Sequence, residues 1–327
     1  MNPLTLISIL KNHTVFIQAH NFPDPDAISS AFGLQQFLAY YGIESSLCYD
    51  GRIDRLSSKK MLDTFGITMF SKEELSHMKE SDFIILVDSQ KKNGNVTDFI
   101  GDEVACIDHH PTYFPYHYEY SDIQPVGACA SIIASYYAST DTPISPKCAA
   151  ALAYGIKMDT ADFTRGTTRL DTDMLAFLFP KSDWSLVTYM YSNTMEFDDL
   201  RAYGAAIQNI CIYDRTGFAY IPFNCAQALI AIISDFILSL DVVDIAIVYA
   251  MQTDGIRFSI RSEETRIHAG TLISRTLNGL GSGGGHPSMS GGIIPKDNIK
   301  LLGENLHNRI HTLFMNAIAE TLKNTPN

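Results

Sequence analysis

The sequence has little positive charge. Its 24 lysines and arginines are outnumbered by 36 aspartates and glutamates, which gives a formal net charge of -12. A protein that wraps long duplex nucleic acid needs a basic surface to displace counterions, so the composition argues against such a partner. A short anionic substrate that is held at a local cluster of cations stays compatible with this charge.

Three further signals are missing. The longest apolar run, residues 226–240, is interrupted by Gln227, Ser234 and Asp235 and is too short to span a bilayer. No N-terminal segment combines a basic start, an apolar core and a small-residue cleavage site, and no two of the six cysteines form a CxxC pair. We therefore expect a cytoplasmic protein with no membrane partner, whose thiols are reduced core residues rather than zinc ligands.

The pattern that is present predicts two α/β domains. Hydrophobic residues make up 46% of the 327 residues, as in a globular protein. In the first part, strands over 14–20, 44–49, 83–88 and 103–108 alternate with helical segments such as 26–41, which predicts a doubly wound parallel sheet. We expect a first domain over 1–190, a connecting helix over 191–210 and a smaller α/β domain over 211–327, with a glycine tract at 279–285 and a last helix over 298–322.

Four apolar segments of the first domain run into acids or imidazoles. The central one is Val104–Ile107, and the four segments lead in chain order to these side chains: His20, Asp24 and Asp26; Asp88; Asp108, His109 and His110; and Asp159. Ligands of a parallel sheet gather beyond the carboxyl ends of its strands. The sequence therefore predicts that these side chains form one site.

The chemistry of these residues indicates a site for two divalent cations. Several carboxylates with one or two imidazoles suit Mn²⁺ or Mg²⁺, with Co²⁺, Fe²⁺ or Zn²⁺ as further options. Asp24 and Asp26 are two apart in a loop stiffened by Pro23 and Pro25, so each carboxylate can point to a different cation. Taken alone, Asp26 is equally consistent with a helix cap, but the other strand ends favour the metal site. Two such cations support phosphoryl transfer.

These motifs resemble the DHH phosphoesterases, a family named for the triplet found here as Asp108-His109-His110. The first motif of that family matches residues 20–30, its second matches Asp88, and its fourth matches Asp159. The end of the chain resembles the DHH-associated domain of nanoRNases, 3'-phosphoadenosine phosphatases and single-strand exonucleases, through residues 258–262 and 283–286. Pro25 and Ser29 stand where many members have glycine, and neither change removes a ligand.

The resemblance implies a role for each residue and places the active site in the cleft between the two domains. One cation would be held by His20, Asp24 and Asp88, and the second by Asp26, Asp88, His109 and Asp159. Asp88 would bridge the two cations, Asp108 would orient an imidazole, and His110 would face the substrate phosphate. Substrate would be held by Arg261, Gly283, Gly284, Gly285 and His286. Arg165 either binds phosphate or is an ordinary loop charge.

The implied activity is that of a Mn²⁺-dependent phosphohydrolase or phosphodiesterase that acts on small nucleotides. Candidate substrates are short single-stranded RNAs, as for an oligoribonuclease, linear or cyclic dinucleotides, and 3'-phosphoadenosine 5'-phosphate. One alternative is an inorganic pyrophosphatase or exopolyphosphatase, although such pyrophosphatases carry a Ser-Arg-Lys-Lys type cluster that this sequence lacks. A catalytically silent nucleotide sensor is the other alternative. A homodimer is compatible with the sequence.

Overall fold

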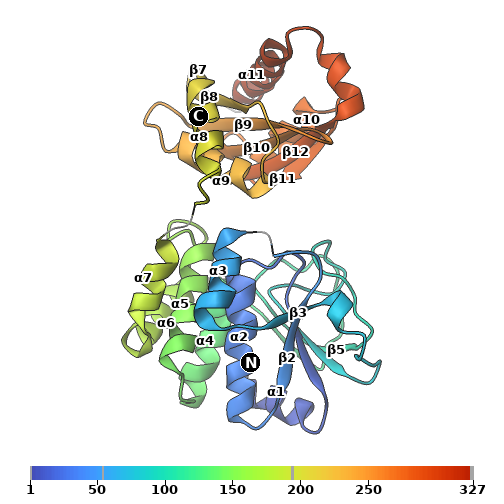
Figure 1. The fold of residues 1–327 in the computed structure, drawn as a ribbon, viewed down its shortest axis with the longest axis vertical. Coiled ribbons are helices and arrows are strands. Elements are labelled where there is room, and N and C mark those ends of the chain that lie inside the picture. The colour runs from blue at the N-terminus through green and yellow to red at the C-terminus, as the bar shows by residue number, and fades with distance from the viewer. Residues whose placement is uncertain (1, 54, 193–194, 325–327) are drawn as a thin grey trace. The chain divides into compact units, whose positions relative to one another are not determined.

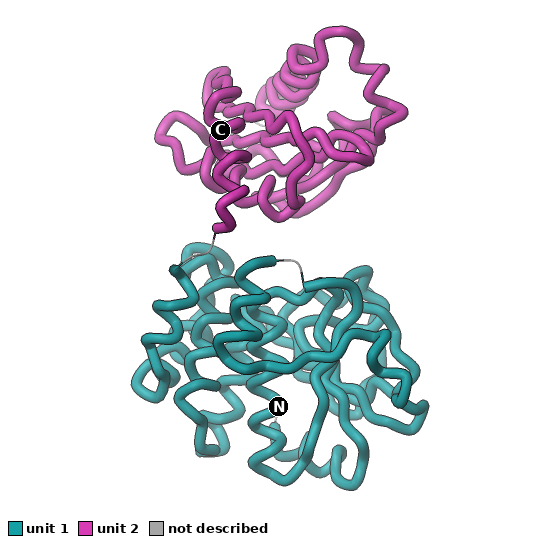
Figure 2. Tube along the Cα trace, viewed as in Figure 1, with its two compact units in different colours: residues 1–194 teal, residues 195–327 magenta. Residues whose placement is uncertain are grey.

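The chain forms two compact units, residues 1–194 and 195–327 (Figure 2). The computed structural model describes residues 2–53, 55–192 and 195–324. Within those ranges no helix combines the length and the apolar character that a bilayer crossing requires. The expected connecting segment, residues 191–210, includes residues 193–194, which lie outside the described ranges. The two units are described separately below.

The first unit contains a six-stranded parallel sheet, as the sequence predicted (Figure 1). Its strands are β1 (Val15–Gln18), β2 (Ser45–Tyr49), β3 (Met69–Ser71), β4 (Phe83–Val87), β5 (Asp102–Asp108) and β6 (Tyr120–Ile123). They are arranged in the order β3-β2-β1-β4-β5-β6. The chain builds outward from β1 to β3 and then returns to lay β4 along the other side of β1. The strand order therefore reverses between β1 and β4, which is where ligands bind in open α/β sheets.

One face of this sheet is covered by helices. They are α1 (Pro3–Leu10), α2 (Pro25–Tyr40), α3 (Leu56–Phe65), α4 (Cys129–Thr140), α5 (Pro146–Asp159), α6 (Arg169–Leu178) and α7 (Trp184–Tyr191). Alternate strand residues such as Ile17, Ile85 and Ile107 share one apolar core with these helices. This alternation follows from the two-residue period of a strand.

The opposite face is covered differently from the usual doubly wound sheet. Phe16, Leu86 and Cys106 pack there against irregular crossovers. These contribute Tyr118 and Leu75, which directly follows the short 3₁₀ helix η1 (Lys72–Glu74). No α-helix of the described residues joins this second core. The crossovers at 88–101 and 109–119 are rich in turn-forming and proline residues, which disfavour a helix. The strand order is that of a doubly wound fold, but three of its five crossovers contain no α-helix.

Helices α2 and α5 pack unusually close to each other. A Cβ atom on Gly33 of α2 would lie 2.7 Å from Leu152 Cδ2, and one on Gly155 of α5 would overlap the Oγ of Ser29. Glycine therefore lets the two helix backbones approach. The first helix begins beside Asp24 and the second ends at Asp159, so this contact also sets the separation of two predicted ligands.

We expect Gly155→Ala to lower the free energy of unfolding of the first unit by about 1–3 kcal/mol, because the added methyl group overpacks this contact. The measurement is chemical denaturation followed by circular dichroism. Gly204→Ala, at a helix position of the second unit with nothing within 4 Å of the added atom, is the control and should leave the unfolding of the first unit unchanged. Equal effects of the two substitutions would contradict this account of the helix contact.

The second unit is a three-layer α/β/α structure around a mixed sheet. Its strands are β7 (Cys211–Tyr213), β8 (Thr216–Ile221), β9 (Ile245–Gln252), β10 (Gly255–Ser262), β11 (Ser282–Gly285) and β12 (Met289–Pro295), in the order β11-β12-β10-β9-β8-β7. Only β8 and β9 pair in parallel. One face packs on α8 (Asp199–Gln208) and α9 (Gln227–Leu238), and the other on α10 (Ala269–Thr276) and α11 (Leu306–Asn324).

Two segments of this unit differ from the sequence prediction. The glycine tract contains an edge strand, β11, because the facing strand β12 also carries glycines and the two backbones can pack together against Ile273. The last helix was expected from residue 298, but residues 296–302 form the 3₁₀ helix η3 and α11 begins at Leu306. Gly303 has a φ of 76°, which ends η3 before the helix starts.

Candidate functional site

The structure brings the predicted acids and imidazoles of the first unit together at the carboxyl end of its sheet. His109 Nε2 lies 3.2 Å from Asp88 Oδ1, 3.4 Å from Asp159 Oδ2 and 4.0 Å from Asp26 Oδ2. His20 Nε2 lies 3.5 Å from Asp88 Oδ2 and 3.8 Å from Asp24 Oδ1. These side chains follow β1, β4 and β5 or lie at the ends of α2 and α5. The reversal of strand order between β1 and β4 therefore coincides with the cluster.

Three groups of side chains in this cluster have the spacing of metal ligands. In each group the potential ligand atoms all lie within 4.8 Å of one another, and the groups are His20, Asp24 and Asp88; Asp26, His109 and Asp159; and Asp88, Asp108, His109 and His110. Asp88 and His109 each belong to two groups. The grouping therefore resembles two adjacent sites that share the region around Asp88.

Asp88 is held in a strained turn at the end of β4. Its φ of 57° lies in the left-handed region, which costs a non-glycine residue roughly 1–3 kcal/mol. The residue is only 2% exposed, and its backbone N–H donates to the carbonyl of Ile107. Its buried Oδ1 accepts no hydrogen bond from the described residues, and its close neighbour is the His109 Nε2 at 3.2 Å. A buried carboxylate oxygen without a partner is costly, and a cation would satisfy it.

The two metal-type imidazoles present the same nitrogen to the cluster. His20 Nδ1 lies 2.8 Å from the carbonyl of Asn21, and His109 Nδ1 lies 3.0 Å from the carbonyl of Val126. A carbonyl only accepts, so Nδ1 carries the proton and a neutral ring presents the Nε2 lone pair to the carboxylates. Backbone carbonyls orient metal-bound histidines in this way. The donor set therefore fits divalent cations.

The pKa values of the cluster reflect an excess of negative charge. Burial alone would lower the pKa of His109, but its contact with Asp88 and the charges of Asp26 and Asp159 raise that pKa to about 11. Burial and the neighbouring charges of Asp24 and Asp88 raise the pKa of Asp159 to about 6. The pKa of Asp26 is raised well above its usual value, first by burial and then by Asp88 and Asp159. Without a cation, protons must compensate this charge.

The structure assigns the helix cap to Asp24 rather than to Asp26. Asp24 Oδ1 accepts from the backbone N–H groups of Asp26 and Ala27 at the start of α2. Asp26 is buried in the first helical turn, and its carboxylate accepts from the N–H groups of Cys129 and Ala130 at the start of α4, at 2.7 and 2.9 Å. The contact between Asp26 and the start of α4 could not be predicted from the sequence, because the two lie about one hundred residues apart along the chain.

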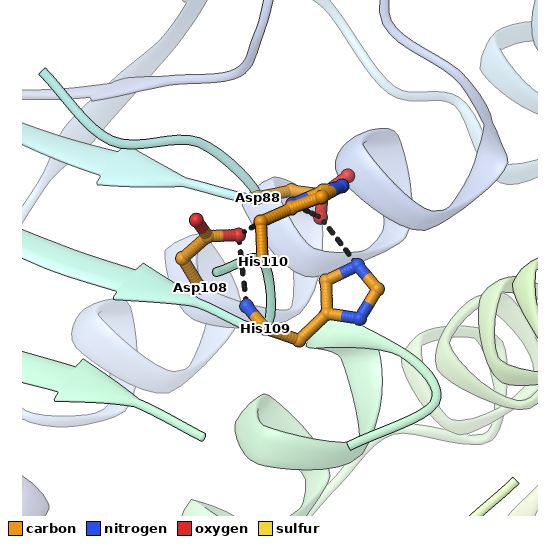
Figure 3. A group of neighbouring side chains, drawn as sticks. All are labelled: Asp88, Asp108, His109 and His110. Atoms are coloured by element: carbon orange, nitrogen blue, oxygen red, sulfur yellow. Dashed lines mark hydrogen bonds and ion pairs between the residues drawn. The ribbon is translucent and has the colours of Figure 1, made fainter. Parts of the chain in front are cut away.

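Asp108 fixes the position of His110 (Figure 3). Its Oδ1 lies 2.9 Å from His110 Nδ1 and accepts from the backbone N–H of His109 at 2.8 Å. Gln90, which the sequence analysis did not single out, donates to Asp108 Oδ2 at 2.8 Å and to the carbonyl of His110 at 2.9 Å. The sequence signal that could have identified Gln90 is its position two residues after Asp88. Gln90 ties the loop after β4 to the end of β5.

Arg165 contacts a member of the cluster. Its Nη2 donates to the carbonyl of Asp159 at 2.7 Å and lies 3.7 Å from Asp159 Oδ1, while the side chain stays 47% exposed. The guanidinium thus lies at the edge of the cluster.

Arg261 and His286, two of the predicted substrate residues of the second unit, lie at one end of its sheet. Arg261 is opposite Met289 in the β10–β12 ladder, and the backbone N–H of His286 donates to the carbonyl of Met289. Arg261 is paired with Asp235 of α9 at 2.5 Å.

The three predicted glycines are not equivalent. A Cβ on Gly283 would crowd Ile273, and one on Gly285 would overlap the carbonyl of Met289, whereas Gly284 has open space. Packing therefore requires glycine at positions 283 and 285. Of the three, only Gly284 leaves space for the close approach of a ligand.

Residues 14–156 match the model described as DHH family, N-terminal domain, and residues 215–312 match the DHHA1 domain. The chain therefore combines a DHH domain with a DHHA1 domain. The DHH match spans β1 to α5 and so contains every strand end that contributes to the cluster.

Similarity to known proteins extends beyond these two domains. Uncharacterized protein MJ1633 of Methanocaldococcus jannaschii is 27% identical over 287 residues, which are 87% of this chain and 59% of that protein. The probable bifunctional oligoribonuclease and PAP phosphatase NrnA of Streptococcus mutans is 26% identical over 317 residues, with 88% and 92% covered. The crystal structure of an exopolyphosphatase-related protein from Bacteroides fragilis has the same fold, with a TM-score of 0.70, 19% identity, and 95% and 96% covered.

Asp88→Asn should lower the affinity for Mn²⁺ by at least about 100-fold. Substitution of a residue that only hydrogen-bonds to a metal ligand already lowers metal affinity about 10- to 100-fold, and Asp88 would be a ligand itself. The measurement is calorimetric titration of the full chain with MnCl₂. Asp173→Asn, on an exposed acid of α6, is the matched control and should bind as the original chain does. Unchanged affinity in Asp88→Asn would show that the cluster is not the metal site.

Proposed function

We propose that this protein is a Mn²⁺-dependent phosphohydrolase that cleaves small nucleotides. The observation that carries this proposal is the unpartnered, buried carboxylate oxygen of Asp88 at the meeting point of the ligand groups. Oxygen and imidazole donors without thiolate favour Mn²⁺ or Mg²⁺, with Co²⁺ as a further option. The four buried cysteines, Cys48, Cys106, Cys129 and Cys148, belong to none of the ligand groups.

The ligand groups support one assignment of roles. His20, Asp24 and Asp88 would hold one cation, and Asp26, His109 and Asp159 the other, with Asp88 shared. Such a pair supplies Lewis acidity, which lowers the pKa of water and offsets charge that develops on a transferred phosphoryl group. Asp26 is further fixed by the two N–H groups of α4, and this keeps its carboxylate in place.

His110 would act on the substrate phosphate directly. Its Nδ1 is 2.9 Å from Asp108, so Nε2 is the nitrogen left to donate a hydrogen bond. The Asp108 carboxylate favours the protonated ring, which can stabilise negative charge on a phosphate oxygen. Gln90 would act through Asp108 as a positioning residue.

The second unit would bind the nucleotide. Arg261 and His286 lie at one end of its sheet, Gly284 leaves room for a close approach, and this unit matches the DHHA1 domain. The similarity to NrnA supports short RNAs and 3'-phosphoadenosine 5'-phosphate as substrates, and dinucleotides are of the same chemical class. The approach of this face to the metal cluster across a cleft between the units remains a prediction, as do the cytoplasmic location and the oligomeric state.

Turnover with Mn²⁺ should be highest on this class of compound. We expect release of mononucleotides from di- to pentanucleotides, or of phosphate from 3'-phosphoadenosine 5'-phosphate, at rates well above phosphate release from pyrophosphate. Asp88→Ala should abolish all of these activities. Preferred hydrolysis of pyrophosphate would instead indicate the pyrophosphatase alternative, and tight nucleotide binding without any turnover would indicate a sensor.

His286→Ala should raise the KM for a dinucleotide by about 10-fold while Mn²⁺ affinity stays unchanged, since His286 lies outside the ligand cluster. Steady-state kinetics and calorimetric titration measure the two effects. His13→Ala, a histidine of the first unit that stacks on Phe83 and lies outside the cluster, is the control and should alter neither value. A normal KM in His286→Ala would remove this residue from the nucleotide site.

A further inference from the structure

The segment directly after His110 exposes a group of aromatic rings. Residues 111–118 read Pro-Thr-Tyr-Phe-Pro-Tyr-His-Tyr, and Tyr113 is 69% exposed, Phe114 56% and Tyr116 37%. Rings of this size dominate cores and interfaces, so neighbouring exposed rings mark a contact surface. The segment belongs to the first unit, and none of its residues is part of the ligand groups.

The segment is fixed at both ends. The carbonyl of His110 accepts from Gln90, and the hydroxyl of Tyr118 accepts from the backbone N–H of Lys91 at 2.9 Å. Tyr118 is buried in the core on the second face of the sheet, and the ring of Tyr116 lies 4.9 Å from it. Pro111 and Pro115 restrict the backbone between these anchors. The backbone that carries the exposed rings is therefore restricted before any ligand binds, which reduces the entropy lost on binding.

The position of Tyr113 and Phe114 suits the base of a bound nucleotide. Tyr113 is three residues from His110, so its backbone lies within about 11 Å of that residue. Residues 109–118 contain no acidic side chain, although the protein has a net charge of -12. An uncharged aromatic surface beside a phosphate site can accept a base without repelling the phosphate.

We propose that Tyr113 and Phe114 form a stacking surface for a base of the substrate. This inference rests on the proposed function, since it places the nucleoside beside the phosphate that the metal cluster would bind. Aromatic side chains stack on any base, and the loss of such a contact weakens binding about 5- to 150-fold per base. Stacking of this kind would favour nucleotides over phosphoesters that carry no base.

Direct binding tests the inference without hydrolysis. A dinucleotide that contains 2-aminopurine and a non-hydrolysable methylenephosphonate linkage is titrated with the full chain in Mn²⁺, where stacking quenches its fluorescence. We expect the double variant Tyr113→Ala/Phe114→Ala to weaken binding by at least about 10-fold and to abolish the quenching. The ring-preserving variant Tyr113→Phe/Phe114→Tyr should behave as the original chain does, and so should Tyr40→Ala, an equally exposed ring at the end of α2.

Kinetics with Mn²⁺ separate this inference from the proposed function. The double variant should raise the KM for a dinucleotide at least about 10-fold and leave kcat, and the KM for the same dinucleotide without its bases, within about twofold. Equal losses on both substrates would show that the segment only supports His110, and unchanged kinetics would show that it binds no base. Either result would overturn the inference.

Two further outcomes have distinct meanings. If the original chain cleaves no nucleotide, the proposed function fails, whereas quenching that depends on Tyr113 and Phe114 would still support the stacking surface. If the double variant changes the oligomeric mass in sedimentation experiments and leaves quenching intact, the rings cover an interface between copies of the chain, and the inference is wrong.

Discussion

The structure of the first unit depends on how the negative charge of four carboxylates around two imidazoles is compensated. Asp24, Asp26, Asp88 and Asp159 meet in one region, where Asp26 and Asp88 are buried and their mutual repulsion is weakly screened. Hydrogen bonds from backbone N–H groups to Asp24 and Asp26 offset part of this cost, but they leave Oδ1 of Asp88 without a donor. Divalent cations would remove the repulsion, and the same charge would then be available for phosphoryl transfer.

The scaffold holds these charges together through contacts that are not themselves charged. The reversal of strand order between β1 and β4 brings the loops after both strands to one place. The close packing of α2 on α5, permitted by Gly33 and Gly155, sets the ends at which Asp24 and Asp159 lie. The start of α4 then reaches Asp26. Each of these contacts is remote along the chain, so the geometry of the cluster is a property of the folded unit.

Much of the fold could be predicted because its signals are local. Apolar runs marked β1, β4 and β5, and the motif residues that follow them are the ones that converge. The short strands β3 and β6 were missed because they carry little periodic signal. The coil on the second face of the sheet was also missed, since a crossover without a helix is not visible in a strand pattern. In the second unit, the edge strand β11 in the glycine tract was not predicted, because it depends on pairing with β12, which is also rich in glycine.

The sequence by itself determined which chemistry is present: the alternation of strands and helices, and acids and imidazoles placed where parallel strands end. These features follow from residue types at short spacing, which a chain carries with it before folding. Only the tertiary structure decided that Asp24 rather than Asp26 caps α2, that Gln90 holds Asp108, and that Arg261 is paired with Asp235. Such contacts join residues from separate elements, and their partners are fixed only when packing brings those elements together.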